Sequence, residues 1–353
     1  MLRLKAALLT VIGLSGATGF GVHQLTAPTY PDAPVVSSRS ADPYGRFPRP
    51  GKVALLALEN RSYEEIIGNH KVPYMNRLAR ENALAARSYA VAHPSLPNYI
   101  ALTSGTSGEI HNDCASCDSE ATNLVDQMNR AHVSWRAYFQ GIPRPGSLAI
   151  RHGNYSAHYN PFAYYSRTRS RDGNQDRTVS FRALDRDLRA NRLPRFSWIG
   201  PNLGHDGHNN SLASTDRYMS RLVPRVLKAL GPRGLLYLTW DEGKPDDKRG
   251  LNGKGGGRIV LIAAGPMARH GVVSRQPFNQ YALLRTLEAG FGLPTLGAAG
   301  ASSSHLLLSL VRDWRASPAT EGRDRWLSET GWRSASKSIE AACAQSPTGC
   351  SAR

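Results

Sequence analysis

Acidic residues are scarce in this sequence, which contains 27 Asp and Glu against 44 Lys and Arg and carries a formal charge of +17. Such a surplus of positive charge favours anionic partners, namely phosphorylated substrates, anionic lipid surfaces or nucleic acids. The sequence has no zinc-finger spacing, no aromatic RNA-binding signature and no basic heptad helix. It therefore predicts no dedicated nucleic-acid module.

Long apolar runs are equally rare, and the one that is present lies near the N-terminus. Two basic residues precede an apolar run from Ala6 to about Val22, which is the pattern of an export signal. Residues 1–25 are thus predicted to be a signal peptide or an N-terminal anchor, and the Pro- and Ser-rich residues 26–50 a linker. No other segment is long and apolar enough to span a bilayer. We expect the protein to be secreted or held in the cell envelope, outside the cytoplasm.

Cysteine is also sparse, with four residues in two close pairs. Cys114 and Cys117 lie in a polar loop, and Cys343 and Cys350 lie in the C-terminal tail. In an exported chain this spacing permits two local disulfides, although four cysteines allow three pairings. The alternative is a zinc site formed by Cys114, Cys117 and the nearby His111.

The remaining sequence alternates between apolar runs of strand length and segments with helical patterning. Predicted strands lie at 52–58, 83–92, 133–139, 195–199, 234–239 and 258–264. Predicted helices lie at 73–81, 97–102, 123–131, 180–190, 215–230 and 279–289, and a further short helix is predicted to start at Tyr63. This alternation predicts an α/β domain with a mainly parallel sheet over 51–314, followed by a polar tail at 315–353. The sequence contains no internal repeat.

Two further segments lack clear periodicity. Residues 140–178 are rich in Gly, Arg, Tyr and Asn, and we expect a long basic loop or insertion that lines the functional site. Gly253 to Gly257 lacks the spacing of a phosphate-binding loop and precedes a strand, so it predicts a mobile surface loop near the substrate.

A rigid turn around one serine indicates serine chemistry, although the sequence lacks the Gly-x-Ser-x-Gly elbow of esterases. Pro94 and Pro97 flank Ser95, and Pro97 is placed to open a helix. A serine at such a turn lies near unpaired helix N–H groups, which stabilise an anionic phosphoryl or acyl group. One alternative is an ordinary N-cap serine. Another is a metal-free esterase that combines Ser95 with His208 and an aspartate.

Polar clusters follow several of the predicted strands. Glu59-Asn60 and Asp241-Glu242 come directly after buried strands, and His205-Asp206-Gly207-His208 follows another. Because the carboxyl ends of parallel strands meet at one edge, these side chains are expected to gather around Ser95. Carboxylate and amide oxygens suit a divalent cation, which would activate the serine and polarise a phosphoryl oxygen. The alternatives are that Asp241 or Glu242 pairs with an arginine, or that the chain is a non-catalytic basic envelope-binding protein.

These motifs resemble the phosphoesterase family of bacterial acid phosphatases and phospholipase C-type enzymes, within the alkaline phosphatase superfamily. The resemblance runs from about Val53 to Pro294. It rests on blocks that stand here as Glu59-Asn60-Arg61-Ser62, His93-Pro94-Ser95-Leu96-Pro97-Asn98-Tyr99, Pro201-Asn202 with Asp206 and His208, Thr239-Trp240-Asp241-Glu242, and the closing segment Tyr281 to Pro294. It implies an alkaline phosphatase-like three-layer sandwich with helices on both faces of the sheet.

The resemblance also implies a role for each matching residue. Ser95 would be the nucleophile that becomes phosphorylated, Asn98 would hold a phosphoryl oxygen, and His208 would lie near the leaving group. The implied ligands of a divalent metal ion are Glu59, Asn60, Ser95, Asp241 and Glu242. The residues expected close to this site are His93, His158, Asn202, His205 and Asp206.

The function implied is an exported metal-dependent phosphoric ester hydrolase that acts through a phosphoserine, most simply a phosphomonoesterase of the acid phosphatase type. The alternatives are a phospholipase C-type phosphodiesterase and a phosphoinositide phosphatase. Phospholipid headgroups and an anionic membrane surface are the further partners expected, and no oligomeric state is indicated. The sequence departs from the family at Tyr159-Asn160-Pro161, at Gly255-Gly256-Gly257 and at Gln280, where the family often has other polar residues or histidine.

Overall fold

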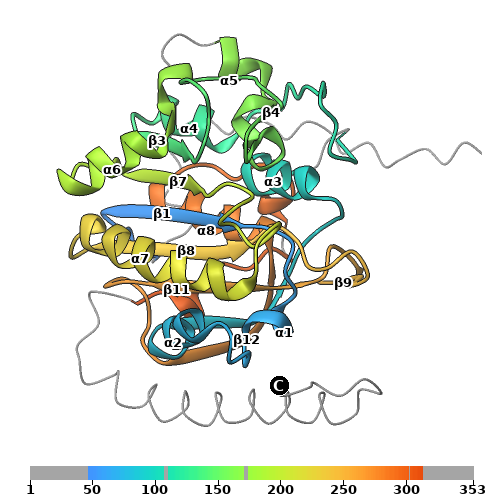
Figure 1. Ribbon diagram of the computed structural model, residues 1–353, viewed down its shortest axis with the longest axis vertical. Helices are drawn as coiled ribbons and strands as arrows, with labels where there is room; N and C mark the ends of the chain where they lie inside the picture. The colour runs from blue at the N-terminus through green and yellow to red at the C-terminus, as the bar shows by residue number, and fades with distance from the viewer. Residues whose placement is uncertain (1–46, 107–109, 171–173, 302, 313–353) are drawn as a thin grey trace, which may run out of the picture. The chain divides into compact units, whose positions relative to one another are not determined.

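The computed structural model describes residues 47–106, 110–170, 174–301 and 303–312 (Figure 1). The predicted signal or anchor, most of the linker, the polar tail, Cys343 and Cys350 lie outside the described residues. Phe47 is buried in the core, so the domain includes the last residues of the predicted linker. No helix among the described residues is long and apolar enough to cross a membrane.

An eight-stranded sheet forms the centre of the domain, in the order β12-β2-β11-β8-β1-β7-β3-β6. Its strands are β1 Lys52–Leu58, β2 Ala83–Tyr89, β3 Trp135–Phe139, β6 Thr178–Ser180, β7 Phe196–Gly200, β8 Gly234–Trp240, β11 Arg258–Ala264 and β12 Val272–Asn279. Only β11 pairs in an antiparallel manner, with β8 on one side and β2 on the other. The predicted mainly parallel sheet is therefore confirmed.

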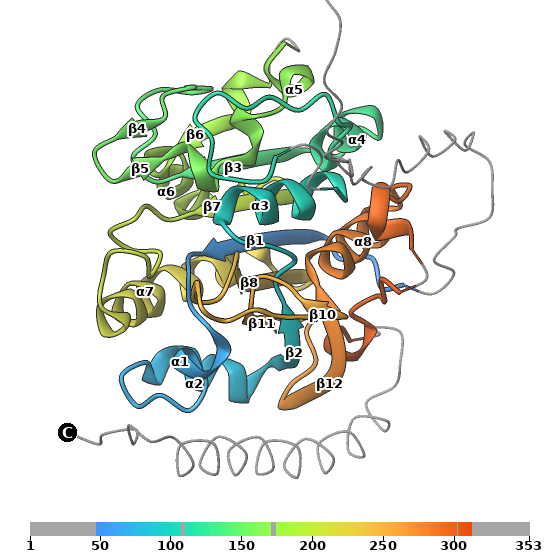
Figure 2. The same ribbon diagram turned by 90° about the vertical axis from the view of Figure 1, so that its right-hand side faces the viewer.

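Successive residues of the central strands point to opposite faces, and both faces are apolar. In β1, Val53 and Leu55 pack into one hydrophobic core, whereas Ala54 and Leu56 pack into a second. Helices α3 Ser95–Ser104, α4 Leu124–Arg130 and α8 Gln280–Phe291 cover the first core. Helices α1 Tyr63–Ile66, α2 Pro73–Glu81, α6 Phe181–Arg189 and α7 Leu212–Leu230 cover the second (Figures 1 and 2). This is the predicted three-layer sandwich.

Helix ends follow capping side chains in the sequence. Asn123 accepts hydrogen bonds from the N–H groups of Val125 and Asp126 at the start of α4, and Asn279 accepts one from Ala282 at the start of α8. Ser211 caps α7, which begins three residues earlier than predicted and retains Pro224 within it.

The sequence does not predict β12, which pairs in parallel with β2 at the edge of the sheet (Figure 2). Its residues include Arg275, Gln276 and Pro277. An edge strand tolerates proline and polar residues because one side of its backbone has no strand partner. Such a strand therefore lacks the apolar run that marks the buried strands.

The expectation of a long loop at 140–178 is wrong, because this segment contains several short elements. They are β4 Arg151–His152, β5 Tyr155–Ser156, η1 Ala157–Tyr159, η2 Pro161–Ala163, α5 Ser166–Ser170, η3 Gln175–Arg177 and the edge strand β6. Tyr155, Tyr159 and Phe162 are buried in the first hydrophobic core. Aromatic side chains thus fix the segment, although their spacing follows no helix or strand period.

Candidate active site

Two adjacent strands bring the predicted acidic clusters together. β1 and β8 are parallel neighbours, and Leu58 lies opposite Trp240 in their register. Glu59-Asn60 and Asp241-Glu242 therefore leave the sheet side by side, and the Asp241 N–H donates to the Leu58 carbonyl at 3.0 Å. Asn60 has a left-handed backbone with φ 55°, which asparagine tolerates better than most residues. Its N–H donates to Asp241 Oδ1 at 2.9 Å.

The serine turn approaches this pair of strands from β2. The His93–Pro94 peptide bond is cis, and Ser95 is the first residue of α3, two residues before the predicted start. Pro94 occupies the N-cap position, so Ser95 is not the N-cap serine of the alternative interpretation. The serine side chain is buried, with 4% of its surface exposed. Its hydroxyl group faces the acidic cluster.

Three oxygen atoms surround the Ser95 hydroxyl at equal distance. Glu59 Oε2, Asn60 Oδ1 and Glu242 Oε1 each lie 3.3 Å from Ser95 Oγ. A hydroxyl group has one hydrogen, so it can donate to only one of these acceptors at a time. Asp241 Oδ2 is also buried and has no hydrogen-bond partner. Such a convergence of unsatisfied oxygen atoms fits a hard divalent cation, which would be attracted to all of them.

Burial makes negative charge costly in this cluster. It raises the pKa of Glu59 and of Asp241 well above the ordinary range, and the neighbouring carboxylates raise each of them further. Burial, followed by repulsion from Asp241 and Asp113, raises the pKa of Glu242 to about 9. A bound cation would remove this penalty, and the donor set is therefore suited to one.

Within the described part of the chain, no three His, Cys, Asp or Glu side chains alone form a group that could hold a metal. The candidate site is completed instead by the Ser95 hydroxyl and the Asn60 amide oxygen. Among the contacts of the described residues, Asp241 and Glu242 pair with Asn60, Ser95 and His93 and not with an arginine. The alternative of an arginine ion pair is therefore wrong.

Two aromatic side chains, Tyr99 and His93, contact the carboxylates of Glu59 and Glu242. The Tyr99 hydroxyl donates a short hydrogen bond to Glu59 Oε1, and Tyr99 itself lies against Trp198. His93 Nδ1 lies 2.5 Å from Glu242 Oε2, which agrees with its predicted position beside the site. The sequence placed Tyr99 in a motif but gave it no role.

The proposed contact of Asn98 with a phosphoryl oxygen does not fit the structure. The Asn98 amide oxygen accepts hydrogen bonds from the N–H groups of Val91 and Ala92, and its amide nitrogen donates to the carbonyls of Ala92 and Pro94. Both ends of the buried amide are therefore occupied within the turn. Asn98 holds the turn in shape, and Ser95 depends on it indirectly.

An aspartate that the sequence did not single out occupies the start of α3. Asp113 Oδ1 accepts a hydrogen bond from the Leu96 N–H at 2.8 Å, so this helix N–H is not free as the serine motif predicted. Asp113 precedes Cys114, which forms a disulfide with Cys117. The disulfide confirms one of the two predicted local pairs and excludes a zinc site at these cysteines.

Asn202, His205, Asp206 and His208 lie on the loop after β7, whereas His158 lies in η1. Asp206 is fully buried, its carbonyl accepts from the Glu59 N–H at 3.0 Å, and its Oδ1 accepts from the His208 N–H at 2.8 Å. The His208 side chain is exposed. Burial lowers the pKa of His158, and the charge of Arg151 lowers it further.

Two of the predicted neighbours have structural partners instead. The His205 ring stacks on Tyr218 at 4.0 Å, and its Nδ1 lies 3.0 Å from Gln140 Oε1. Asn202 Oδ1 accepts from the Gly204 N–H at 3.1 Å. These contacts order the loop that carries Asp206 and His208.

The model of the phosphoesterase family matches residues 68–294 of this chain. A phosphatidylinositol-3-phosphatase from Mycobacterium tuberculosis is 31% identical over 249 residues, which cover 70% of this chain and 79% of that protein. The chain belongs to the phosphoesterase family. It is a hydrolase of ester bonds, and the alternative of a non-catalytic envelope-binding protein is wrong.

Two further comparisons give lower identities for this phosphoesterase. A phosphate-repressible acid phosphatase from Penicillium chrysogenum is 26% identical, over 72% of this chain and 62% of the fungal protein. A crystal structure of a protein in the alkaline phosphatase superfamily from Vibrio parahaemolyticus has a TM-score of 0.50 and 12% identity, over 69% of this chain and 67% of that one. The structural likeness supports the predicted superfamily fold.

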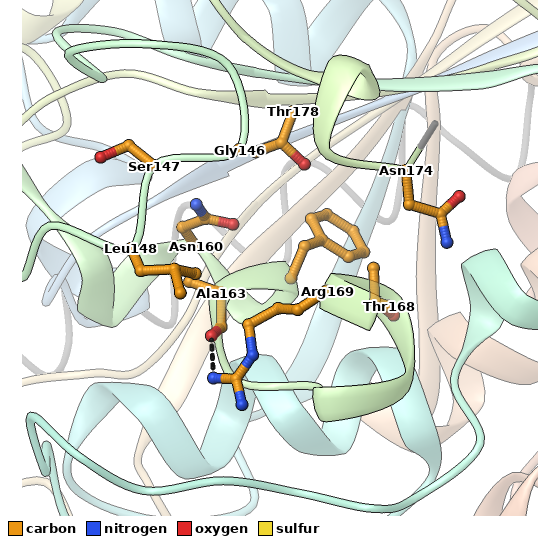
Figure 3. A pocket seen from close by; sticks show the side chains of 10 residues that line it. Gly146, Ser147, Leu148, Asn160, Ala163, Thr168, Arg169, Asn174 and Thr178 are labelled. Atoms are coloured by element: carbon orange, nitrogen blue, oxygen red, sulfur yellow. Dashed lines mark hydrogen bonds between the residues drawn. The ribbon is translucent and has the colours of Figure 1, made fainter. Parts of the chain in front are cut away.

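The phosphoesterase also has a pocket whose lining residues are separate from the acidic cluster. Figure 3 shows the side chains that line it. It is lined by residues of the 146–178 segment, including Leu148, Asn160 and Thr178. Arg169 points across it and donates to the Ala163 carbonyl at 3.0 Å. None of the residues that surround Ser95 line this pocket.

Proposed function

We propose that this phosphoesterase hydrolyses phosphomonoesters with the help of a divalent cation, and that Ser95 is its covalent nucleophile. The observation that carries the proposal is the position of Ser95 Oγ, which lies 3.3 Å from each of three ligand oxygens. The ligands would be Glu59, Asn60, Asp241, Glu242 and the serine itself. A metal-free esterase would gain nothing from this convergence of carboxylates around its nucleophile.

The reaction would proceed in two displacements at phosphorus. A divalent cation in this position supplies positive charge that lowers the pKa of the serine hydroxyl and offsets charge on the phosphoryl oxygens. Ser95 Oγ attacks the phosphorus in line with the ester oxygen, and the bond to the leaving oxygen breaks. Water then attacks the phosphoserine and releases inorganic phosphate. Because all the proposed ligands are oxygen atoms, the site would favour a hard or borderline divalent cation.

His208 is the group that we propose to protonate the leaving oxygen. Its side chain is exposed and lies on the loop whose Asp206 carbonyl accepts a hydrogen bond from the Glu59 N–H. Replacing His208 with alanine should lower kcat for phenyl phosphate by about 10²- to 10⁴-fold, because phenolate is a poor leaving group. The loss for p-nitrophenyl phosphate should be far smaller, since p-nitrophenolate departs without a proton.

The matched control is His70→Ala, which removes an exposed histidine between α1 and α2. It should leave both rates unchanged. Steady-state assays of each variant give the ratio of kcat for phenyl phosphate to kcat for p-nitrophenyl phosphate. Equal losses on both substrates in His208→Ala would contradict a role in leaving-group protonation.

Two features support a lipid-related substrate as the second candidate. One relative carries the name phosphatidylinositol-3-phosphatase, and the +17 charge favours approach to an anionic membrane surface. Together with the predicted export signal, they support a secreted or cell-envelope phosphatase that also accepts phosphoinositide headgroups. A phospholipase C-type diesterase would share the same core residues.

An activity panel with added divalent metal ions tests the substrate class. It compares p-nitrophenyl phosphate, bis-p-nitrophenyl phosphate, phosphatidylcholine and phosphoinositides. A phosphomonoesterase should have kcat/KM for the monoester at least about tenfold above that for the diester. Phosphate release from phosphoinositides would support the second candidate, and preferential hydrolysis of the diester or of phosphatidylcholine would reject monoester specificity.

A further inference from the structure

The candidate site depends on three separate segments of the chain. Glu59 and Asn60 belong to residues 59–62, Ser95 to residues 90–95, and Asp241 and Glu242 to residues 241–243. Ligand oxygens on separate segments must be held to within a few tenths of an ångström to bind one cation well. A fourth segment, residues 247–257, contacts all three, and neither the family resemblance nor the proposed reaction gives it a role.

Glycines in this fourth segment bind the backbone that leads to the serine. The Gly256 N–H donates to the Ala90 carbonyl, and the Ala90 N–H donates to the Gly257 carbonyl, both at 2.9 Å. The Gly243 N–H donates to the Gly256 carbonyl at 2.7 Å. A Cβ atom on Gly256 would lie 1.8 Å from the Ala92 carbonyl oxygen, so only glycine fits there. The prediction of a mobile surface loop is therefore wrong for this part.

Asp247 fixes the other end of the segment through its carboxylate. Its Oδ2 accepts hydrogen bonds from Ser62 Oγ at 3.0 Å and from the Arg258 N–H at 3.1 Å, and its Oδ1 accepts from Arg249 Nε at 2.8 Å. The side chain is 9% exposed. Burial alone would raise the pKa of Asp247, but the hydrogen bonds from Arg249 and Arg258 hold it well below the ordinary range. Asp247 is therefore a fixed anion.

The same residue reaches the second ligand segment through its backbone. His93 Nε2 lies 2.9 Å from the Asp247 carbonyl oxygen, and His93 Nδ1 lies 2.5 Å from Glu242 Oε2. Ser62 closes the arrangement, because its Oγ also accepts from the Lys244 N–H at 3.0 Å. Asp247 thus contacts Ser62, two residues after Asn60, and His93, two residues before Ser95.

We propose that Asp247 is a positioning residue, which fixes the spacing of the cation ligands through Ser62 and His93. Asp247 contacts neither Ser95 nor the ligand oxygens among the described contacts, so it would act only through these partners. The inference rests on the proposed cation site and adds to it a residue that lies 154 positions along the chain from His93, through which it would align Ser95.

The test measures the affinity of the protein for Mn²⁺ alone, from the EPR signal of free Mn²⁺, in the wild type and in Asp247→Asn. Asparagine keeps the volume but removes the charge that Ser62, Arg249 and Arg258 share. The Kd for Mn²⁺ should rise by about 10- to 100-fold, which is the usual effect of losing an outer partner of metal ligands. The neighbouring Asp246→Asn removes the same charge from an exposed side chain, and its Kd should equal that of the wild type.

Ser62→Ala provides a second variant that leaves the arginine contacts of Asp247 intact. Ser62→Ala should raise the Kd for Mn²⁺ by a smaller factor than Asp247→Asn. The double variant should raise the Kd by less than the product of the two single factors, because both substitutions remove the same hydrogen bond between Ser62 and Asp247. A folded Asp247→Asn protein with wild-type affinity would overturn the inference, and if that variant does not fold, an unchanged Kd in Ser62→Ala would do so. Failure of the wild type itself to bind Mn²⁺ would instead overturn the proposed cation site together with the inference.

Discussion

Ser95→Ala is expected to reduce the turnover of p-nitrophenyl phosphate by about 10⁴- to 10⁶-fold. The substitution removes the oxygen that would attack phosphorus, and the neighbouring Tyr99 hydroxyl is already engaged in a hydrogen bond to Glu59. Ser95 Oγ is the oxygen that lies 3.3 Å from a side-chain oxygen of each of Glu59, Asn60 and Glu242. The variant should therefore retain its fold while losing the covalent step.

Trapping the intermediate separates nucleophilic catalysis from a purely structural effect. Acid quenching of the wild type during turnover of ³²P-labelled substrate should yield a phosphoserine at position 95, and Ser95→Ala should yield none. Ser104→Ala, at the other end of α3, tests whether any serine removed from this helix has the same effect. It should keep activity within a few-fold of the wild type. Near-normal turnover by Ser95→Ala would show that the nucleophile has been misassigned.

The parts of the fold that the sequence predicts are those in which burial dictates composition. Strands β1 and β8 are buried on both faces along nearly their whole length, and each therefore reads as an uninterrupted apolar run. Their parallel pairing then brings Glu59 and Asp241 to one edge without any further information. For this reason the convergence of the acidic clusters at one place could be predicted before the structure.

Residues that act through the backbone of a distant loop leave no such pattern. Asp113 and Asp247 sit in polar stretches, where an aspartate bound to an N–H group looks like any solvated one. Asn98 was misassigned for the opposite reason. It stands inside a recognisable motif, but its amide is used to close the turn rather than to contact the substrate. Motif membership thus pointed to the candidate site but did not distinguish the groups proposed to react from those that support the turn.

Removal of the cation by a chelator is expected to abolish hydrolysis and also to change how stability depends on pH. The pKa of Glu242 is about 9 in the folded protein, against an ordinary value of 4.5 in the unfolded chain. Between these values the folded protein holds more protons than the unfolded chain, so its free energy of unfolding falls as pH rises. Glu59 and Asp241 act in the same direction, because burial raises the pKa of each. The Tm of the chelated protein should fall by about 5–10 °C from pH 5 to pH 9.

Saturating Mn²⁺ should reverse this trend, because a cation bound to ionised carboxylates stabilises the folded state most where they are fully deprotonated. Asp241→Asn removes one buried charge at nearly constant volume, so without the cation it should melt above the wild type at pH 8, although it should be inactive. Asp246→Asn, which changes an exposed charge, should follow the wild type throughout. Thermal melts of each variant between pH 5 and pH 9, with chelator and with Mn²⁺, give the Tm values to compare. Retained activity after chelation, with melts that do not differ between the two conditions, would contradict a cation at Ser95 and leave the buried carboxylates without a counter-charge.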